Sequence, residues 1–152
     1  MSAEHFLDTN LFIYQIEARD EVKAPIAEKI IREGVTTGNA CISFQVIQEC
    51  LSTITRKAIS PLGAADSQGY LDAILSPLLV VGASIGLYSK AIDIQSRYRF
   101  SFYDALIVAA ALEAGCTRLL TEDLQHGQRI GDLVIENPFL AGPSEGLAPS
   151  QT

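Results

Sequence analysis

Hydrophobic residues along the chain form two patterns: short continuous runs, and longer segments in which they recur at helical spacing. The short runs predict β-strands at residues 4–8, 39–43, 78–81, 117–121 and 133–135. The longer segments predict α-helices at residues 11–19, 25–34, 44–57, 64–75, 84–98 and 102–114. Strands that alternate with helices predict an α/β fold, a three-layer αβα sandwich around a central, mainly parallel sheet of about five short strands.

Several residues mark the ends of these elements. Ser84 and Ser101 are typical helix N-caps, and Pro25 suits the first turn of the second helix. Gly34 is expected to follow the end of that helix, because glycine readily adopts the left-handed conformation found there. The run at 78–81 is continuous and apolar, which predicts a strand covered on both faces.

The length and composition indicate one domain without a membrane span. Beyond Pro138 the composition turns to Gly, Pro and Ser, so we expect a folded domain at 1–140 and a flexible tail at 141–152. No apolar run reaches the length of a membrane span, and the first residues lack the pattern of a secretory signal. The three widely spaced Cys residues predict buried thiols rather than disulfides or a zinc site. We therefore expect a cytoplasmic protein.

The net charge of −7 bears on the choice of partner. Nucleic-acid-binding proteins usually carry a basic surface, so this charge taken alone argues against one. It is equally compatible with a protein that holds divalent cations or binds a basic partner.

Four acidic residues follow predicted strands or lie early in the helices after them: Asp8, Glu49, Asp104 and Asp123. Each has a purely structural alternative; Asp8 suits a helix N-cap, and Asp104 stands three residues after Ser101, as in a capping box. A parallel sheet, however, brings the carboxyl ends of its strands to one edge, so we expect the four side chains to converge there.

Clustered carboxylates repel one another unless a cation neutralises them. Oxygen-only ligands suit Mg²⁺ or Mn²⁺, and in many nucleases two such ions, roughly 3.5–4 Å apart, activate water and stabilise the leaving oxygen of a phosphodiester. The sequence has no glycine-rich nucleotide-binding loop and no Ser nucleophile elbow, and its two His residues are too scattered for a zinc site. The pattern thus favours metal-dependent hydrolysis of phosphate esters.

Four sequence blocks carry a resemblance to a known family: Phe6-Leu-Asp-Thr-Asn10, Ser43-Phe-Gln-Val-Ile-Gln-Glu49, Phe102-Tyr-Asp-Ala-Leu-Ile-Val-Ala-Ala110 and Leu119-Leu-Thr-Glu-Asp-Leu124. In this order and spacing they resemble the PIN domain, the ribonuclease fold of VapC-type toxins. The resemblance covers residues 6 to about 139, nearly the whole chain. The chain departs from the pattern at His126, where many family members have Phe three residues after the last Asp.

The resemblance implies a metal-dependent endoribonuclease, the toxin of a toxin–antitoxin pair. It assigns the catalytic role, and the binding of Mg²⁺ or Mn²⁺, to Asp8, Glu49, Asp104 and Asp123. Asn10 and Thr121 would orient those carboxylates by hydrogen bonds. The implied partners are an RNA substrate, an antitoxin that covers the acidic site with a basic or aromatic segment, and a second copy of the chain in a homodimer.

Arg97 and Arg99, just before the helix that carries Asp104, are candidate RNA-contacting residues. Tyr98 and Phe100 are aromatic residues that could stack on bases. The alternative is an ordinary helix end, where cations interact favourably with the helix dipole.

Two other functions remain open from the sequence. One is a catalytically silent PIN-like binding or scaffold module, although a scaffold gains nothing from four mutually repelling carboxylates. The other is a phosphohydrolase that acts on small phosphate esters. Phosphatases on related sheets typically use a nucleophilic Asp with a second Asp two residues later, where this chain has Asn10.

Overall fold

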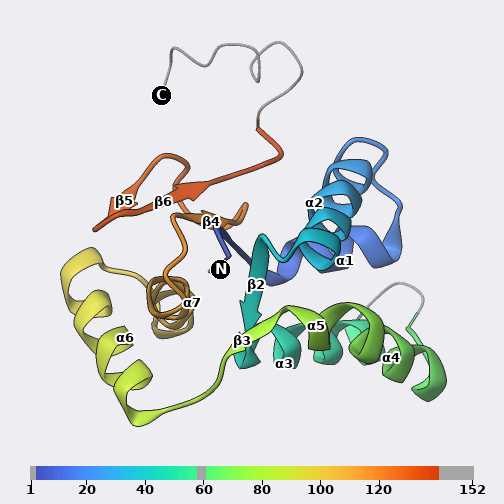
Figure 1. Cartoon of the computed structure of the whole chain (residues 1–152), viewed down its shortest axis with the longest axis horizontal. Coiled ribbons are helices and arrows are strands. Elements are labelled where there is room, and N and C mark those ends of the chain that lie inside the picture. Colours follow the sequence, from blue (N-terminus) through green and yellow to red (C-terminus); the bar gives the residue numbers. More distant parts are fainter. Residues whose placement is uncertain (1–2, 58–60, 141–152) are drawn as a thin grey trace.

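The computed structural model describes residues 3–57 and 61–140, and the expected flexible tail at 141–152 lies outside them. Six strands form one sheet in the order β3-β2-β1-β4-β6-β5 (Figure 1). Their bounds are β1 (His5–Leu7), β2 (Ala40–Ser43), β3 (Leu79–Val81), β4 (Arg118–Leu120), β5 (Arg129–Ile130) and β6 (Leu133–Glu136). All neighbours run parallel except β5 and β6. The predicted α/β fold with a mainly parallel sheet is confirmed.

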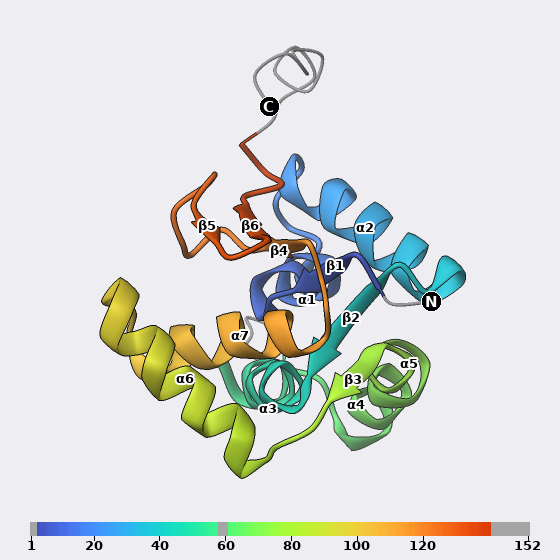
Figure 2. The ribbon, with the colours of Figure 1, turned by 60° about the vertical axis from the view of Figure 1, so that its left-hand side comes forward.

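Helices cover both faces of this sheet. Their bounds are α1 (Thr9–Glu17), α2 (Lys23–Thr37), α3 (Phe44–Ser52), α4 (Ala64–Tyr70), α5 (Ser76–Leu78), α6 (Ile85–Tyr98) and α7 (Phe102–Glu113). Helices α6 and α7 lie on one side of the sheet and α1 and α2 on the other (Figure 2). Wider π-helical turns at Thr53–Lys57 and Leu71–Leu75 extend α3 and α4. None of the helices in the described part of the chain is both long and apolar enough to cross a membrane.

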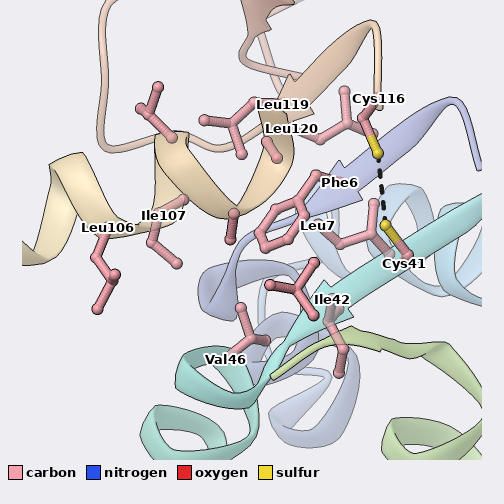
Figure 3. Packing of buried hydrophobic residues seen from close by; sticks show 14 of the residues in the cluster. Phe6, Leu7, Cys41, Ile42, Val46, Leu106, Ile107, Cys116, Leu119 and Leu120 are labelled. Carbon is pink, nitrogen blue, oxygen red and sulfur yellow. Dashed lines mark hydrogen bonds between the residues drawn. The ribbon is translucent and has the colours of Figure 1, made fainter. Parts of the chain in front are cut away.

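The centre of the sheet is the centre of the core. Phe6 and Leu7 of β1, which lies between β2 and β4, are fully buried on opposite faces of the sheet, and α7 packs over one of these faces (Figure 3). Every residue of α7 from Ala105 to Ala111 is buried, because the sheet covers one side of this helix and α6 the other. The Sγ atoms of Cys41 and Cys116, on either side of β1, lie 3.4 Å apart (Figure 3).

The predicted end of the second helix is wrong. Helix α2 continues past Gly34 and ends at Gly38, whose φ of 78° is the left-handed conformation expected after a C-terminus. Gly34 serves a packing role instead, since a Cβ atom there would lie 2.6 Å from the Cβ of Ala40 in β2. Glycine at this position lets α2 approach the sheet closely.

The prediction for residues 78–81 is also wrong in part. Leu78 belongs to α5, and β3 is an edge strand in which Leu79 is 44% exposed and Val80 62% exposed. A continuous apolar run can therefore mark a sheet edge as well as a buried strand. The short strand β5 was not predicted; it joins β6 through the two-residue turn Gly131–Asp132.

Candidate active site at the carboxyl ends of β1 and β4

The order of the strands creates a crevice between β1 and β4. From β1 the chain proceeds to β2 and β3 on one side, and it later returns to β4 on the other side. Open α/β sheets bind ligands at such a switch point, beyond the carboxyl ends of the strands. Asp8 follows β1 directly, and its backbone N–H donates to the carbonyl oxygen of Leu120 at 3.1 Å. Thr121 directly follows β4, and its side chain lies beside that of Asp8.

Asp8 combines a structural and an electrostatic role. Its Oδ1 accepts the backbone N–H of Thr9 at 2.7 Å, which caps α1, and its Oδ2 accepts the hydroxyl of Thr121 at 2.8 Å. The side chain is 7% exposed. Burial raises the pKa of Asp8 to about 6; the two hydrogen bonds oppose this rise, whereas the negative charges of Asp123 and Glu49 add to it. A charged Asp8 is therefore costly without a compensating cation.

Glu49 and Asp123 are linked to Asp8 through Thr9 and Thr121, of which Thr9 binds Asp8 with its backbone N–H and Thr121 with its hydroxyl. Thr9 Oγ1 donates to Glu49 Oε1 at 2.7 Å, and the backbone N–H of Asp123 donates to Thr121 Oγ1 at 3.0 Å. Asn10 Nδ2 donates to Asp123 Oδ2 at 3.2 Å and lies 3.5 Å from Thr121 Oγ1. Three of the four predicted carboxylates thus belong to one hydrogen-bonded group.

Asp104 is placed at the same end of the molecule but is held only by its backbone. Its N–H donates to Ser101 Oγ at 3.2 Å, which is the expected cap of α7. Within the described residues, its carboxylate makes no hydrogen bond or ion pair. Its side chain is partly exposed and can turn toward a ligand.

The donor set suits a hard divalent cation without forming a closed cage. In the parts of the chain that the structure describes, no three His, Cys, Asp or Glu side chains lie close enough together to hold a metal ion by themselves. Asn10 Oδ1 is buried near the carboxylates and has no hydrogen-bond partner within residues 3–57 and 61–140. Mg²⁺ commonly takes one or two carboxylates and keeps several waters, which fits an open arrangement of oxygen donors.

Two residues of this group were not predicted from the sequence. Thr9 bridges Asp8 and Glu49, and Gln45 Nε2 donates to Glu49 Oε2 at 3.0 Å. Thr9 stands inside the Asp-Thr-Asn trio, and Gln45 lies one helical turn before Glu49. The sequence could have indicated Gln45, because residues four apart on a helix are neighbours. It could not have indicated the contact of Thr9 with Glu49, which joins residues 40 positions apart.

A second group of side chains fixes the loop after β4. Lys23 Nζ pairs with Glu122 Oε1 at 2.9 Å, and the Tyr14 hydroxyl donates to Glu122 Oε2 at 2.6 Å. The ring of Phe139 packs edge-on against Tyr14, and Lys23 lies over both rings. Since Glu122 stands between Thr121 and Asp123, these contacts hold that loop against α1 and α2.

A depression of about 430 Å³ opens beside Glu49. It is lined by Thr9, Gln48, Glu49, Ser52 and Thr53. The Thr9 and Thr53 hydroxyls in this lining already donate to Glu49. The Ser52 hydroxyl and the Gln48 amide are the groups that can donate hydrogen bonds to an anionic chain such as a phosphate backbone.

A comparison with protein-family models identifies the fold that carries this group. The model of the PIN domain family matches residues 5–130, which contain every residue of the hydrogen-bonded group. The chain belongs to the PIN domain family. No functionally curated protein matches its sequence.

Solved structures share this PIN fold at low sequence identity. A toxin–antitoxin complex from Klebsiella pneumoniae has a TM-score of 0.64 and 17% identity, over 89% of this chain and 98% of that one. DNA-bound VapBC from Salmonella typhimurium has a TM-score of 0.64 and 20% identity, over 90% and 98% of the two chains. Mycobacterium tuberculosis VapC20, a toxin that cleaves the sarcin–ricin loop, has a TM-score of 0.57 and 20% identity, over 78% and 91%.

The two candidate RNA-contacting arginines of this PIN domain lie at the end of α6. Arg97 is exposed, and its Nε donates to Asp93 Oδ1 at 3.2 Å; Arg99 follows the helix with a φ of 60°. Tyr98 and Phe100 stack on each other, with centroids 6.1 Å apart, and both pack against the core. Each of these aromatic rings thus already packs against the other and against the core. RNA contact by the two arginines stays a prediction.

Proposed function

We propose that this PIN domain is a metal-dependent endoribonuclease and the toxin of a toxin–antitoxin pair. The observation that carries the proposal is the hydrogen-bonded group of Asp8, Glu49 and Asp123 at the switch point of the sheet. Burial of the Asp8 carboxylate near two other negative charges destabilises the folded state, and a bound cation would reduce this electrostatic cost. Family membership points to the same chemistry.

The site residues have distinct roles in this proposal. Asp8, Glu49, Asp104 and Asp123 would hold Mg²⁺ or Mn²⁺ and are the catalytic residues. The ion would supply Lewis-acid stabilisation of the charge on the phosphate oxygens and lower the pKa of the attacking water. Asn10 and Thr121 orient the carboxylates through the hydrogen bonds described above.

The proposed partners follow from charge and from the structural neighbours. Two of the similar structures are toxin–antitoxin complexes, so we propose an antitoxin with a basic segment that covers the acidic site of this net-negative chain. We further propose a homodimer, for which the exposed apolar residues Leu79, Val80 and Ile85 offer surface to cover. The compartment consistent with an RNA substrate is the cytoplasm.

The test is cleavage of total cellular RNA by the purified protein, with Mn²⁺, Mg²⁺ or a chelator. Asp8→Asn and Asp104→Asn should each lower the cleavage rate by roughly 100-fold or more. Asp132→Asn is the matched control: Asp132 is exposed in the turn before β6, at the amino ends of the parallel strands, whereas Asp8 follows the carboxyl end of β1. This variant should cleave like the wild type.

The outcomes separate the alternatives. Discrete fragments that need metal and vanish in both site variants would establish the nuclease. A protein that neither cleaves RNA nor binds Mn²⁺ would be the scaffold module instead. Hydrolysis of p-nitrophenyl phosphate without RNA cleavage would favour the small-molecule phosphohydrolase.

A further inference from the structure

Gln45 connects two parts of the site that share no other side-chain hydrogen bond in the described residues. It is the second residue of α3 and only 3% exposed. Its Nε2 donates to Glu49 Oε2 at 3.0 Å and to the carbonyl oxygen of Tyr103 at 3.1 Å. Because a carboxylate and a carbonyl group can only accept, the amide must present its NH₂ group to both. Gln45 therefore ties α3 to the first turn of α7.

The two partners of Gln45 lie next to the chemistry of the site. One is Glu49 itself, whose other oxygen is held by Thr9. The other, Tyr103, immediately precedes Asp104, whose carboxylate has no hydrogen bond of its own among the described residues. A change in the Tyr103 contact would shift the backbone that carries Asp104 relative to Glu49.

The buried amide also carries a cost. Gln45 Oε1 is enclosed and has no hydrogen-bond partner among the described residues. Leaving such an acceptor buried and unpaired destabilises the folded state, and an apolar side chain of similar size would avoid this cost. The stability of the fold therefore does not by itself explain why residue 45 is a glutamine rather than an apolar residue.

We propose that Gln45 is a positioning residue that sets the separation of Glu49 and Asp104 for binding a divalent cation. The proposal rests on the proposed function, because it assumes that these two carboxylates share a metal site. Gln45 does not contact the metal in this scheme. It acts through Glu49 and through the backbone of Tyr103.

The test is titration of metal-free protein with Mn²⁺ by calorimetry, for the wild type and Gln45→Met. Methionine has similar length but cannot donate, so the Kd for Mn²⁺ should rise about tenfold, within the range seen when a hydrogen bond to a metal ligand is removed. Gln68→Met is the matched control, since Gln68 is exposed on α4 and bonds to Asp72. Its Kd should stay within twofold of the wild type.

A second variant and a double mutant separate positioning from a general effect on folding. Gln45→Asn keeps the amide but is too short to reach both acceptors, so its Kd should rise as well, even if Gln45→Met folds poorly. In an Asp104→Asn background, Gln45→Met should raise the Kd less than it does in the wild-type background, because one of the two ligands whose separation Gln45 sets is gone.

The failure of this inference is distinguishable from that of the proposed function. A wild type that binds Mn²⁺ and cleaves RNA, with both Gln45 variants binding Mn²⁺ equally well, overturns the role of Gln45 alone. An undiminished effect of Gln45→Met in the Asp104→Asn background also overturns it. A wild type that binds no Mn²⁺ overturns both proposals.

Discussion

Asp8 both caps the N-terminus of α1 and has a charged form that is destabilised by its surroundings. Its carboxylate caps α1 and accepts the Thr121 hydroxyl, yet it is buried near two other negative charges. The hydrogen bonds only partly offset the loss of water, so the pKa of Asp8 stays well above its usual value. The site is therefore least favourable when it is fully ionised and metal-free.

The stability of the metal-free protein should therefore depend on pH through Asp8. Its carboxyl group has a pKa of about 6 when folded and about 4 when unfolded, so the folded state binds more protons between these values. The contribution of Asp8 to the free energy of unfolding should fall as pH rises from 4 to 6, by at most about 3 kcal/mol at 1.36 kcal/mol per pKa unit.

Urea unfolding in EDTA at pH 4.5 and pH 7 would measure this dependence. Asp8→Asn cannot ionise, so the fall should be smaller in this variant by the contribution of Asp8, and its stability at pH 7 should exceed that of the wild type. Parallel pH profiles for the two proteins would show that Asp8 ionises normally in the folded state.

At the scale of the elements, the packing of α2 on β2 depends on a missing methyl group. A Cβ atom at Gly34 would lie 2.6 Å from that of Ala40, which is far inside van der Waals contact. The exposed Gly69 of α4 is also helical but has no atom within 4 Å of an added Cβ. The two glycines provide a matched pair.

Replacing each glycine by alanine should move stability in opposite directions. Gly34→Ala forces α2 away from the sheet and should cost about 1–3 kcal/mol. Gly69→Ala should stabilise by up to about 1 kcal/mol, because alanine is the better helix former and meets no neighbour. Thermal unfolding of the two variants measures both effects. A stabilised Gly34→Ala protein would mean that α2 can move away without cost.

The same glycine illustrates what the sequence could and could not predict. The strand–helix alternation and the positions of Asp8 and Thr121 followed from periodicity, because local pattern and fold agree there. The role of Gly34 did not, since a close contact between α2 and β2 depends on residues that are distant in sequence. Nor could pattern show that β3 lies at the edge, because the order of strands is a property of the whole sheet.

Long-range side-chain contacts were the least predictable part of the site. The bond from Gln45 to Tyr103 joins residues 58 positions apart, and that from Tyr14 to Glu122 spans 108. Both contacts form only when the helices are packed in their final positions on the sheet, so the local sequence pattern does not indicate them.

At the scale of the molecule, the last described residues complete the fold. Phe139 packs against Tyr14 with ring centroids 5.1 Å apart and lies 5.6 Å from Lys23 Nζ. The C-terminal end of the described chain thereby covers the group that fixes Glu122. The expected domain boundary at residue 140 places this contact inside the domain.

Truncation should show the value of this contact. A chain that ends at residue 140 keeps Phe139 and should melt within about 2 °C of the full chain. A chain that ends at residue 137 loses the ring and should melt several degrees lower, since about 1 kcal/mol corresponds to roughly 2–4 °C at this size. Calorimetry on the three chains decides the point. A large loss at the first truncation would place residues 141–152 within the folded domain.

The reaction of the buried cysteines with a thiol reagent can measure how often the folded structure opens locally. Cys41, Cys50 and Cys116 are all buried, and burial raises the pKa of the Cys50 thiol to about 12, so little reactive thiolate of Cys50 is present at neutral pH. A thiol reagent should therefore label the folded chain only as fast as it opens. Cys41 and Cys116, in contact across β1, would become accessible together, whereas Cys50 on α3 would report opening beside Glu49. Labelling with and without Mn²⁺ would then reveal which part of the molecule a cation holds shut.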